Sequence, residues 1–212
     1  MTWFVANHEW VFELFVEHLW LSLVPTFLGL GLALVIGVLL YQVPVLRSAA
    51  SVVCTVVYTI PSLALFMFIP LAIGTSFIDP INVVIALTVY STALGVRAVF
   101  LGLGTVDRDV VSTAQAIGYS RLQNLFHVQL PLAVPALFSV GRVVAVTNVS
   151  LVTVGSLIGS GGLGDLFTAG YQRWFVEEIL VGIIGVLLIA FVTDRVIEFA
   201  GWLLTPWNRE AR

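Results

Sequence analysis

Long apolar runs separated by short polar segments dominate the chain. A helix needs about 20 mostly apolar residues to cross the hydrocarbon core of a bilayer. The pattern predicts five such spans, at Leu21–Tyr41, Ala49–Ile73, Ile81–Leu103, Leu130–Ile158 and Ile179–Ala200. No stretch between them is long enough for a separate soluble domain. We therefore predict an all-α integral membrane protein with one membrane domain over residues 21–205.

The first 20 residues have a different pattern, in which apolar and polar positions alternate at helical spacing. Glu9, Glu13 and Glu17 stand four residues apart and share one helix face. Trp3 and Trp10 suit a membrane–water interface. We expect an interfacial helix over residues 1–20 that leads into the first span, with a frayed terminus as the alternative. Residues 206–212 form a short tail.

Two features inside the predicted spans concern helix packing. Pro61 and Pro70 fall within the second span, where a proline removes a backbone hydrogen bond and kinks the helix. Gly29, Ala33 and Gly37 form a stripe of small residues in the first span. Such a stripe allows a neighbouring helix to approach closely.

The composition excludes several classes of protein. Hydrophobic residues make up 59% of the chain and charged residues only 10%, against about 25% charged in soluble domains. All nine basic residues are Arg, so the chain lacks the lysine that a P-loop places on nucleotide phosphates. The net charge of −3 provides no basic surface for nucleic acid.

The charges divide unequally between the two sides of a five-span topology. The N-terminus and the loops around residues 74–80 and 159–178 carry seven acidic residues and Arg173. The opposite side carries Arg47, Arg108, Arg121, Arg209 and Arg212. Because basic residues concentrate on the cytoplasmic side, we expect the N-terminus outside and the C-terminus in the cytoplasm.

The polar segment at residues 104–129 is the most informative part of the chain. Asp107 is placed to cap a helix that Gly118 ends, and Ser120 to cap a second helix running to about His127. Pro131 and Pro135 then open the next span. The alternative is an ordinary loop, although loops longer than about 12–15 residues usually carry function. We expect a helix–turn–helix on the cytoplasmic face.

This segment resembles the cytoplasmic motif of permease subunits of bacterial ABC importers. Ser112-Thr113-Ala114 stands where that family has Glu-Ala-Ala, followed by Gly118 and by Leu130-Pro131. Ser112 in place of Glu removes any ion pair that the Glu would make. The resemblance implies coupling helices at about residues 105–129 that dock on an ATPase subunit. The residues it assigns to coupling are Asp107, Ser112, Ala114, Gly118, Leu130 and Pro131.

Further motifs resemble the osmoprotectant branch of that family. They are TIPSLALF (Thr59–Phe66), VYSTALGVRAVFLGL (Val89–Leu103), IGSGGLGDLF (Ile158–Phe167) and LLTPW (Leu203–Trp207). The resemblance implies the MetI-like permease fold and import of glycine betaine, carnitine, choline or proline across the bacterial plasma membrane. It also implies three partners: a cytoplasmic ATPase that holds ATP and Mg²⁺, a second permease subunit and an extracytoplasmic solute-binding protein. This chain would be a non-catalytic subunit without a cofactor of its own.

Polar residues at the kinks and inside the spans are candidates for lining the pore. They are Tyr58, Thr59, Pro61, Ser62, Asn148 and Thr153, together with Arg97 and Arg142. Arg97 lies near a span end, where snorkelling to the interface is an equal alternative. We expect Arg142 to face inward or towards the cytoplasm, and Arg195 to pair with Glu198 at i, i+3.

Other functions fit the sequence less well. Gly159–Gly164 matches G-x-G-x-x-G, but it follows a membrane span rather than a β-strand, which argues against a dinucleotide site. His8, His18 and His127 have no metal-ligand spacing. The alternatives left open are an importer of methionine or of a betaine-like thiol compound, and an ATP-independent channel or membrane scaffold.

Overall fold

The computed structural model describes residues 2–208, and these residues form helices joined by short turns without any strand. The helices are α1 (Thr2–Ala6), α2 (His8–Tyr41), α3 (Pro44–Thr59), α4 (Ser62–Ile73), α5 (Pro80–Gly104), α6 (Arg108–Ala116), α7 (Arg121–Asn124), α8 (Leu130–Gly155), α9 (Gly164–Gln172) and α10 (Val176–Leu204). A π-helical turn, η1 (Leu125–Gln129), precedes α8, a 3₁₀ turn, η2 (Ser156–Ile158), follows it, and η3 (Pro206–Asn208) ends the described chain. Arg209 and Arg212, assigned above to the tail, lie outside the described residues.

The helices give the predicted number of membrane spans. Four continuous helical stretches are long and apolar enough to cross a bilayer: His8–Tyr41, Pro80–Gly104, Arg121–Ile158 and Val176–Leu204. The bent pair α3 and α4 brings the number to five if the pair counts as one span. The chain is thus an all-α membrane protein, as its hydropathy predicts.

The first span differs from the prediction at its start. We expected a boundary near residue 20 between an interfacial helix and the span, but α2 is one helix of 34 residues. No Gly or Pro occurs between His8 and Trp20 to end the helix. Val11 and Leu14 are buried against Val149, Leu163 and Ile189. This packing holds the N-terminal turns of α2 in line with the rest of the span.

The second span is broken rather than kinked. Helix α3 ends at Thr59, and α4 starts at Ser62 in a direction 100° away. Ile60 and Pro61 between them have extended backbone angles. Proline disfavours the helical conformation of the residue before it, which explains why the break falls at this point. Pro70, by contrast, stays inside α4.

Helix α5 lies at the centre of the bundle. It contacts α2, α3, α4 and α8, while α10 packs on α8 and α9. The stripe of small residues on α2 faces α5: a Cβ added at Gly29 would lie 2.3 Å from Ser91 Cβ, and one at Gly37 would lie 2.7 Å from Val99 Cβ. The predicted close helix approach is therefore present.

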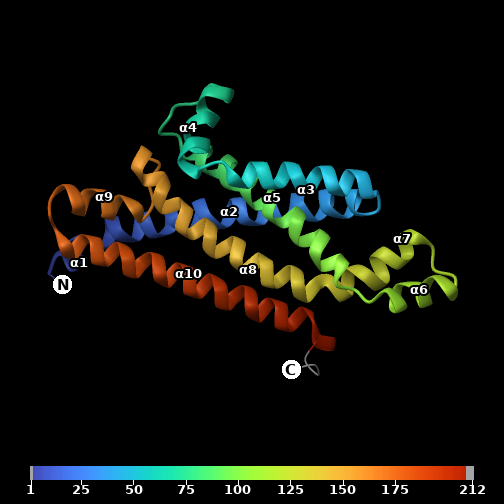
Figure 1. Ribbon diagram of the computed structural model, residues 1–212. Helices are drawn as coiled ribbons and strands as arrows, with labels where there is room; N and C mark the ends of the chain where they lie inside the picture. The colour runs from blue at the N-terminus through green and yellow to red at the C-terminus, as the bar shows by residue number, and fades with distance from the viewer. Residues whose placement is uncertain (1, 209–212) are drawn as a thin grey trace.

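The connecting elements gather at two opposite ends of the bundle (Figure 1). Helices α6 and α7 extend from one end, and α1 and α9 lie at the other. Helix α4 projects away from the other helices, and α10 runs alongside α8. The two ends present different polar groups, which are described next.

Candidate functional site

The first part of the 105–129 segment forms the helix–turn–helix that the sequence predicts. The Asp107 side chain accepts a hydrogen bond of 2.8 Å from the Asp109 N–H and so caps α6. Ser120 caps α7 in a capping box with Gln123. Between the two helices, Gly118 has φ +101°. Only glycine adopts this backbone region without strain, so the turn depends on Gly118.

We expected the second helix of this segment to end near His127, but it does not end there. Helix α7 continues through η1 into α8, so that Arg121–Ile158 forms one helical stretch of 38 residues. Leu130 and Pro131 therefore lie within this stretch. The π-helical turn directly precedes Pro131, whose ring nitrogen cannot donate the usual helical bond. The wider turn accommodates the proline without ending the helix.

The 105–129 segment exposes an apolar surface away from the bundle. Its exposed apolar residues are Val110, Ile117, Tyr119, Leu122 and Phe126. A groove of about 410 Å³ runs along α6 and is lined by Asp109, Val110, Thr113, Ala114, Ile117, Tyr119 and Val128. Ser112 is exposed, and its hydroxyl donates to the Asp109 carbonyl at 3.0 Å. Val110, Ile117 and Tyr119 share this groove, and exposed apolar surface of this kind marks interaction sites.

The break between α3 and α4 collects four of the predicted pore residues. Tyr58, Thr59 and Pro61 are exposed, and Ser62 is half-buried. The Tyr58 ring meets Tyr90 of α5 edge to face, with 6.1 Å between ring centroids. The Tyr90 hydroxyl donates to the Ile60 carbonyl, which the break has freed from the helix. Helix α5 thus stabilises the broken conformation.

The remaining polar candidates lie in different environments. Asn148 is 1% exposed, and its amide donates to the hydroxyls of Thr26 and Ser91, both at 2.8 Å. It therefore joins α8 to α2 and α5 inside the bundle and offers no open surface. Thr153 is half-buried and donates to the Ser150 carbonyl. Arg97 is exposed on α5.

Arg142 is paired with acidic residues of α10. Its Nε and Nη2 atoms donate to the two carboxylate oxygens of Asp194 at 2.7 and 2.8 Å. Its Nη1 atom lies 3.1 Å from Glu198, which also pairs with Arg195 at 2.6 Å. The predicted Arg195–Glu198 pair is confirmed. The Asp194 partner of Arg142 was missed because the two residues are 52 positions apart in the chain.

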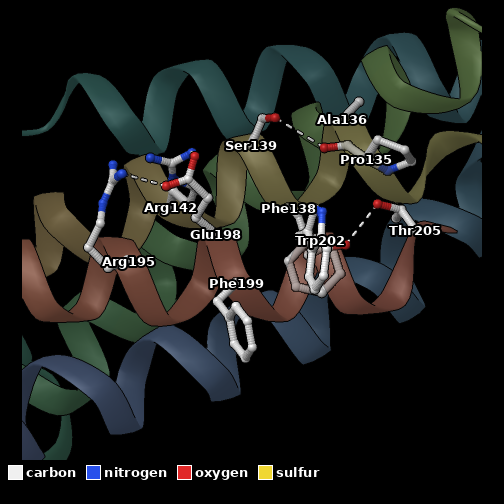
Figure 2. Close-up of a pocket in the computed structure, with 11 residues that line it drawn as sticks. Pro135, Ala136, Phe138, Ser139, Arg142, Arg195, Glu198, Phe199, Trp202 and Thr205 are labelled. Carbon is white, nitrogen blue, oxygen red and sulfur yellow. Dashed lines mark hydrogen bonds and ion pairs between the residues drawn. The ribbon is translucent and has the colours of Figure 1, made fainter. Parts of the chain in front are cut away.

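A cavity of about 650 Å³ lies beside these charges, between α8 and α10 (Figure 2). Pro135, Ser139 and Arg142 line it from α8, and Glu198 and Trp202 line it from α10. Figure 2 shows the Ser139 hydroxyl donating to the Pro135 carbonyl and the Arg195 guanidinium directed at Glu198. The cavity therefore combines a charged end with an aromatic end.

At the opposite end of the bundle, α2 holds the glycine-rich loop. The Gly162 N–H donates to Glu17 Oε2 at 2.9 Å, and the Leu163 N–H donates to His18 Nδ1 at 3.2 Å. His18 Nε2 donates to the Val149 carbonyl at 3.0 Å, which fixes the neutral tautomer. The backbone N–H groups of Gly162 and Leu163 are thus already hydrogen-bonded within the protein, and a dinucleotide phosphate could not bind to them. Burial, with a smaller contribution from the charge of Glu17, raises the pKa of Asp165 in this loop region.

These features define a class of protein: a polytopic helical membrane protein with a broken span and an exposed helical segment at one end. The chain belongs to the family described as "Binding-protein-dependent transport system inner membrane component", whose model matches residues 27–200. Members of this family are permease subunits of ABC transporters in the inner membrane, generally non-catalytic, with ATP hydrolysis supplied by a separate subunit.

Curated relatives include permeases named for small solutes. The chain is 31% identical over 197 residues to the carnitine transport permease protein OpuCB of Listeria monocytogenes, covering 92% of this chain and 89% of that one. It is 29% identical to the choline transport system permease protein OpuBB of Bacillus subtilis, with 90% and 86% covered. It is 30% identical to the osmoprotectant import permease protein OsmW of Salmonella typhimurium, with 94% of each covered.

Solved structures share the fold. A chain of the MetNI methionine ABC transporter in an inward-facing conformation superposes with a TM-score of 0.73 at 26% identity, covering 91% of this chain and 97% of that one. A chain of an amino acid ABC transporter gives a TM-score of 0.71 at 16% identity, with 93% and 97% covered. The predicted ABC importer permease fold is therefore confirmed.

Proposed function

We propose that this chain is the permease subunit of an ATP-driven importer for a zwitterionic or cationic quaternary ammonium solute, such as glycine betaine, carnitine or choline. The curated relatives that match almost its whole length are named for carnitine, choline and osmoprotectants. Methionine is the alternative cargo, because a methionine transporter shares the fold at 26% identity.

The exposed apolar surface of the 105–129 segment carries the proposal of ATP coupling. We name residues 105–129 the coupling segment and propose that its α6 groove docks on a cytoplasmic ATPase. Asp107, Gly118 and Ser120 shape the segment, Ala114 lines the groove and Ser112 lies beside it. The orientation follows from the arginine distribution: the coupling segment and the C-terminus are cytoplasmic, and the N-terminus and the glycine-rich loop are outside.

The broken second span supports a solute path at the α3–α4 break. Non-helical backbone at membrane depth is tolerated where it lines a water-filled cavity or is buried in protein. Tyr58, Thr59, Pro61 and Ser62 lie there, with Tyr58 offering an aromatic face to a quaternary ammonium group. A second permease subunit completes the pore, and an extracytoplasmic binding protein delivers the solute. Asn148 lies outside this path, because it is buried between helices.

Reconstitution tests the proposal directly. The chain is co-expressed with an ATPase subunit and placed in proteoliposomes with a solute-binding protein. We expect glycine betaine, carnitine or choline to stimulate ATP hydrolysis and to accumulate in the vesicles, and methionine to do neither. Stimulation by methionine alone would reassign the cargo. Solute flux without ATP would support the channel alternative.

A further inference from the structure

Asn124 occupies an unusual position in the coupling segment. Its side chain is fully buried, although Arg121, Leu122 and Gln123 directly before it are all exposed. An amide loses free energy on burial unless its polar atoms find partners. The hydrogen bonds of the Asn124 side chain therefore matter for the structure of the segment.

The Asn124 amide connects three elements. Its Nδ2 atom donates to the Val111 carbonyl at 2.8 Å, in the middle of α6 and 13 residues away in the chain. Its Oδ1 atom accepts a hydrogen bond of 3.3 Å from Gln129 Nε2, at the end of η1. Asn124 itself is the last residue of α7. One side chain thus bonds α6 to the helical stretch that becomes α8.

Few other contacts hold α6 in place. Helix α6 packs chiefly on α7 and η1, and the covalent link to α7 is the turn around Gly118. Glycine allows that turn wide conformational freedom. Residues 105–107 join α6 to the span α5, whereas a displacement of α6 reaches α8 through the turn around Gly118, through the packing on α7 and η1, and through the Asn124 bond. Gln129, which donates to Asn124, belongs to the π-helical turn η1, and π-helical turns occur frequently at functional sites.

We propose that Asn124 is a positioning residue that locks α6 to the start of α8, so that movement of the docked α6 is transmitted to the membrane spans. This inference rests on the proposed ATP coupling. With the lock intact, α6, α7 and α8 move as one body. Without it, α6 follows the ATPase while α8 stays behind, and ATP is hydrolysed without transport.

The mechanical part of the proposal is tested on the isolated full chain. Cys54 is replaced by Ala, and spin labels are attached at Gln115→Cys on α6 and His127→Cys on η1, both exposed positions. We expect a narrow distance distribution in the parent and a clearly broader one in Asn124→Ala. Asn124→Leu keeps the side-chain bulk without the hydrogen bonds and should broaden it too. An unchanged distribution in both variants would overturn the proposal.

The functional part is tested in proteoliposomes with the ATPase and binding protein. For Asn124→Ala and Asn124→Leu we expect normal assembly and ATP hydrolysis, with the solute imported per ATP reduced about tenfold. Loss of a hydrogen bond worth about 1.4 kcal/mol shifts the equilibrium between the locked and unlocked positions of α6 by that factor. The matched control is Asn82→Ala, which removes an equally buried asparagine that bonds Thr75 and Ser76, outside the coupling segment. It should keep the parental ratio.

The outcomes separate the two proposals. An equal loss of ratio in Asn82→Ala would assign the effect to a general loss of stability and overturn the role of Asn124. A parental ratio in both Asn124 variants would do the same, even with a broadened distance distribution. If the parent complex shows no solute-stimulated hydrolysis, the proposed function fails, whereas the distance measurement still decides whether Asn124 locks α6.

Discussion

Arg142 of α8 and Asp194 of α10 form a two-pronged ion pair, with N–O distances of 2.7 and 2.8 Å. The pair lies within two predominantly apolar spans, next to Arg195 and Glu198 of α10. Each side chain is about a quarter exposed, at 27% and 22%. Ionisable groups within spans are costly unless they are paired or face water, so each of the two charges makes the other tolerable.

Removing one partner of this pair should destabilise the protein. We expect Arg142→Met to lower the free energy of unfolding by about 1–3 kcal/mol, below the 3–5 kcal/mol typical of fully buried pairs because both side chains are partly exposed. Arg142→Met leaves Arg195 with two carboxylates, Asp194 and Glu198, whereas Arg142→Met/Asp194→Leu leaves the balanced pair Arg195–Glu198 and should recover most of the loss. Thermal unfolding in detergent measures both. A double variant less stable than the single one would contradict this account.

Gly118→Val should separate the coupling segment from the ATPase. A β-branched residue at φ +101° is strained by about 1–3 kcal/mol, although the site has open space around it. We expect normal insertion, loss of ATPase co-purification and loss of uptake. Asn tolerates positive φ better than Val does, so Gly118→Asn should retain more ATPase co-purification and more solute uptake. Ser112→Glu is the control on the exposed face of α6 and should transport normally.

Gly161→Ala should loosen the glycine-rich loop. Gly161 has φ +84°, and an added Cβ would lie 2.4 Å from Glu17 Oε1. The Glu17 carboxylate would have to move, and its bond to the Gly162 N–H would break. We expect a loss of about 1–3 kcal/mol in stability, measured by thermal unfolding. Gly31→Ala, in open space on α2, should instead be neutral or stabilising by up to about 1 kcal/mol.

Asp165 should make the stability of the region around α9 depend on pH. Burial and the Glu17 charge raise its pKa in the folded state above the usual 3.8, so the folded protein binds the proton more tightly than the unfolded chain does. The stability from this group is complete below about pH 4 and is lost as the pH rises through the raised pKa. Asp165→Asn should therefore melt higher than the parent at pH 7 and equally at pH 4. An equal melting temperature at pH 7 would show that the ionised carboxyl is not disfavoured.

Topology reporters test the proposed orientation. Fusions after Asp79 and Asp165 should report the outside, because both lie at the end of the bundle that carries the acidic loops. A fusion after Arg121 and one at the C-terminus should report the cytoplasm. The measurement pairs a reporter active only outside with one active only inside. An outside result after Arg121 would remove the physical basis for ATPase docking.

The sequence predicted those features that depend on neighbouring residues. Asp107 and Ser120 cap helices because their side chains reach backbone N–H groups two or three positions ahead. The positive φ of Gly118 and the Arg195–Glu198 pair are equally local. The spans followed from hydropathy, since length and apolar character alone decide whether a helix crosses a bilayer.

Features that depend on distant residues could not be predicted. The break at Pro61 was expected as a kink, because its full extent involves the Tyr90 hydroxyl 30 residues away. The polarity of Asn148 favoured a pore position, but Thr26 and Ser91 satisfy its amide inside the bundle. Asn124 gave no signal at all, because its acceptor is the backbone carbonyl of Val111, which no side-chain pattern records.

The length of α8 has a mechanical consequence. The stretch from Arg121 to Ile158 bends between α7 and α8 in Figure 1, but the 26 residues of α8 alone measure about 39 Å at 1.5 Å per residue, beyond the roughly 30 Å thickness of the hydrocarbon core. A tilt of α8 that starts at the 105–129 segment therefore displaces the opposite end, which carries the glycine-rich loop. A ligand that clamps the outer loop should therefore slow ATP hydrolysis on the far side of the membrane, without touching the ATPase.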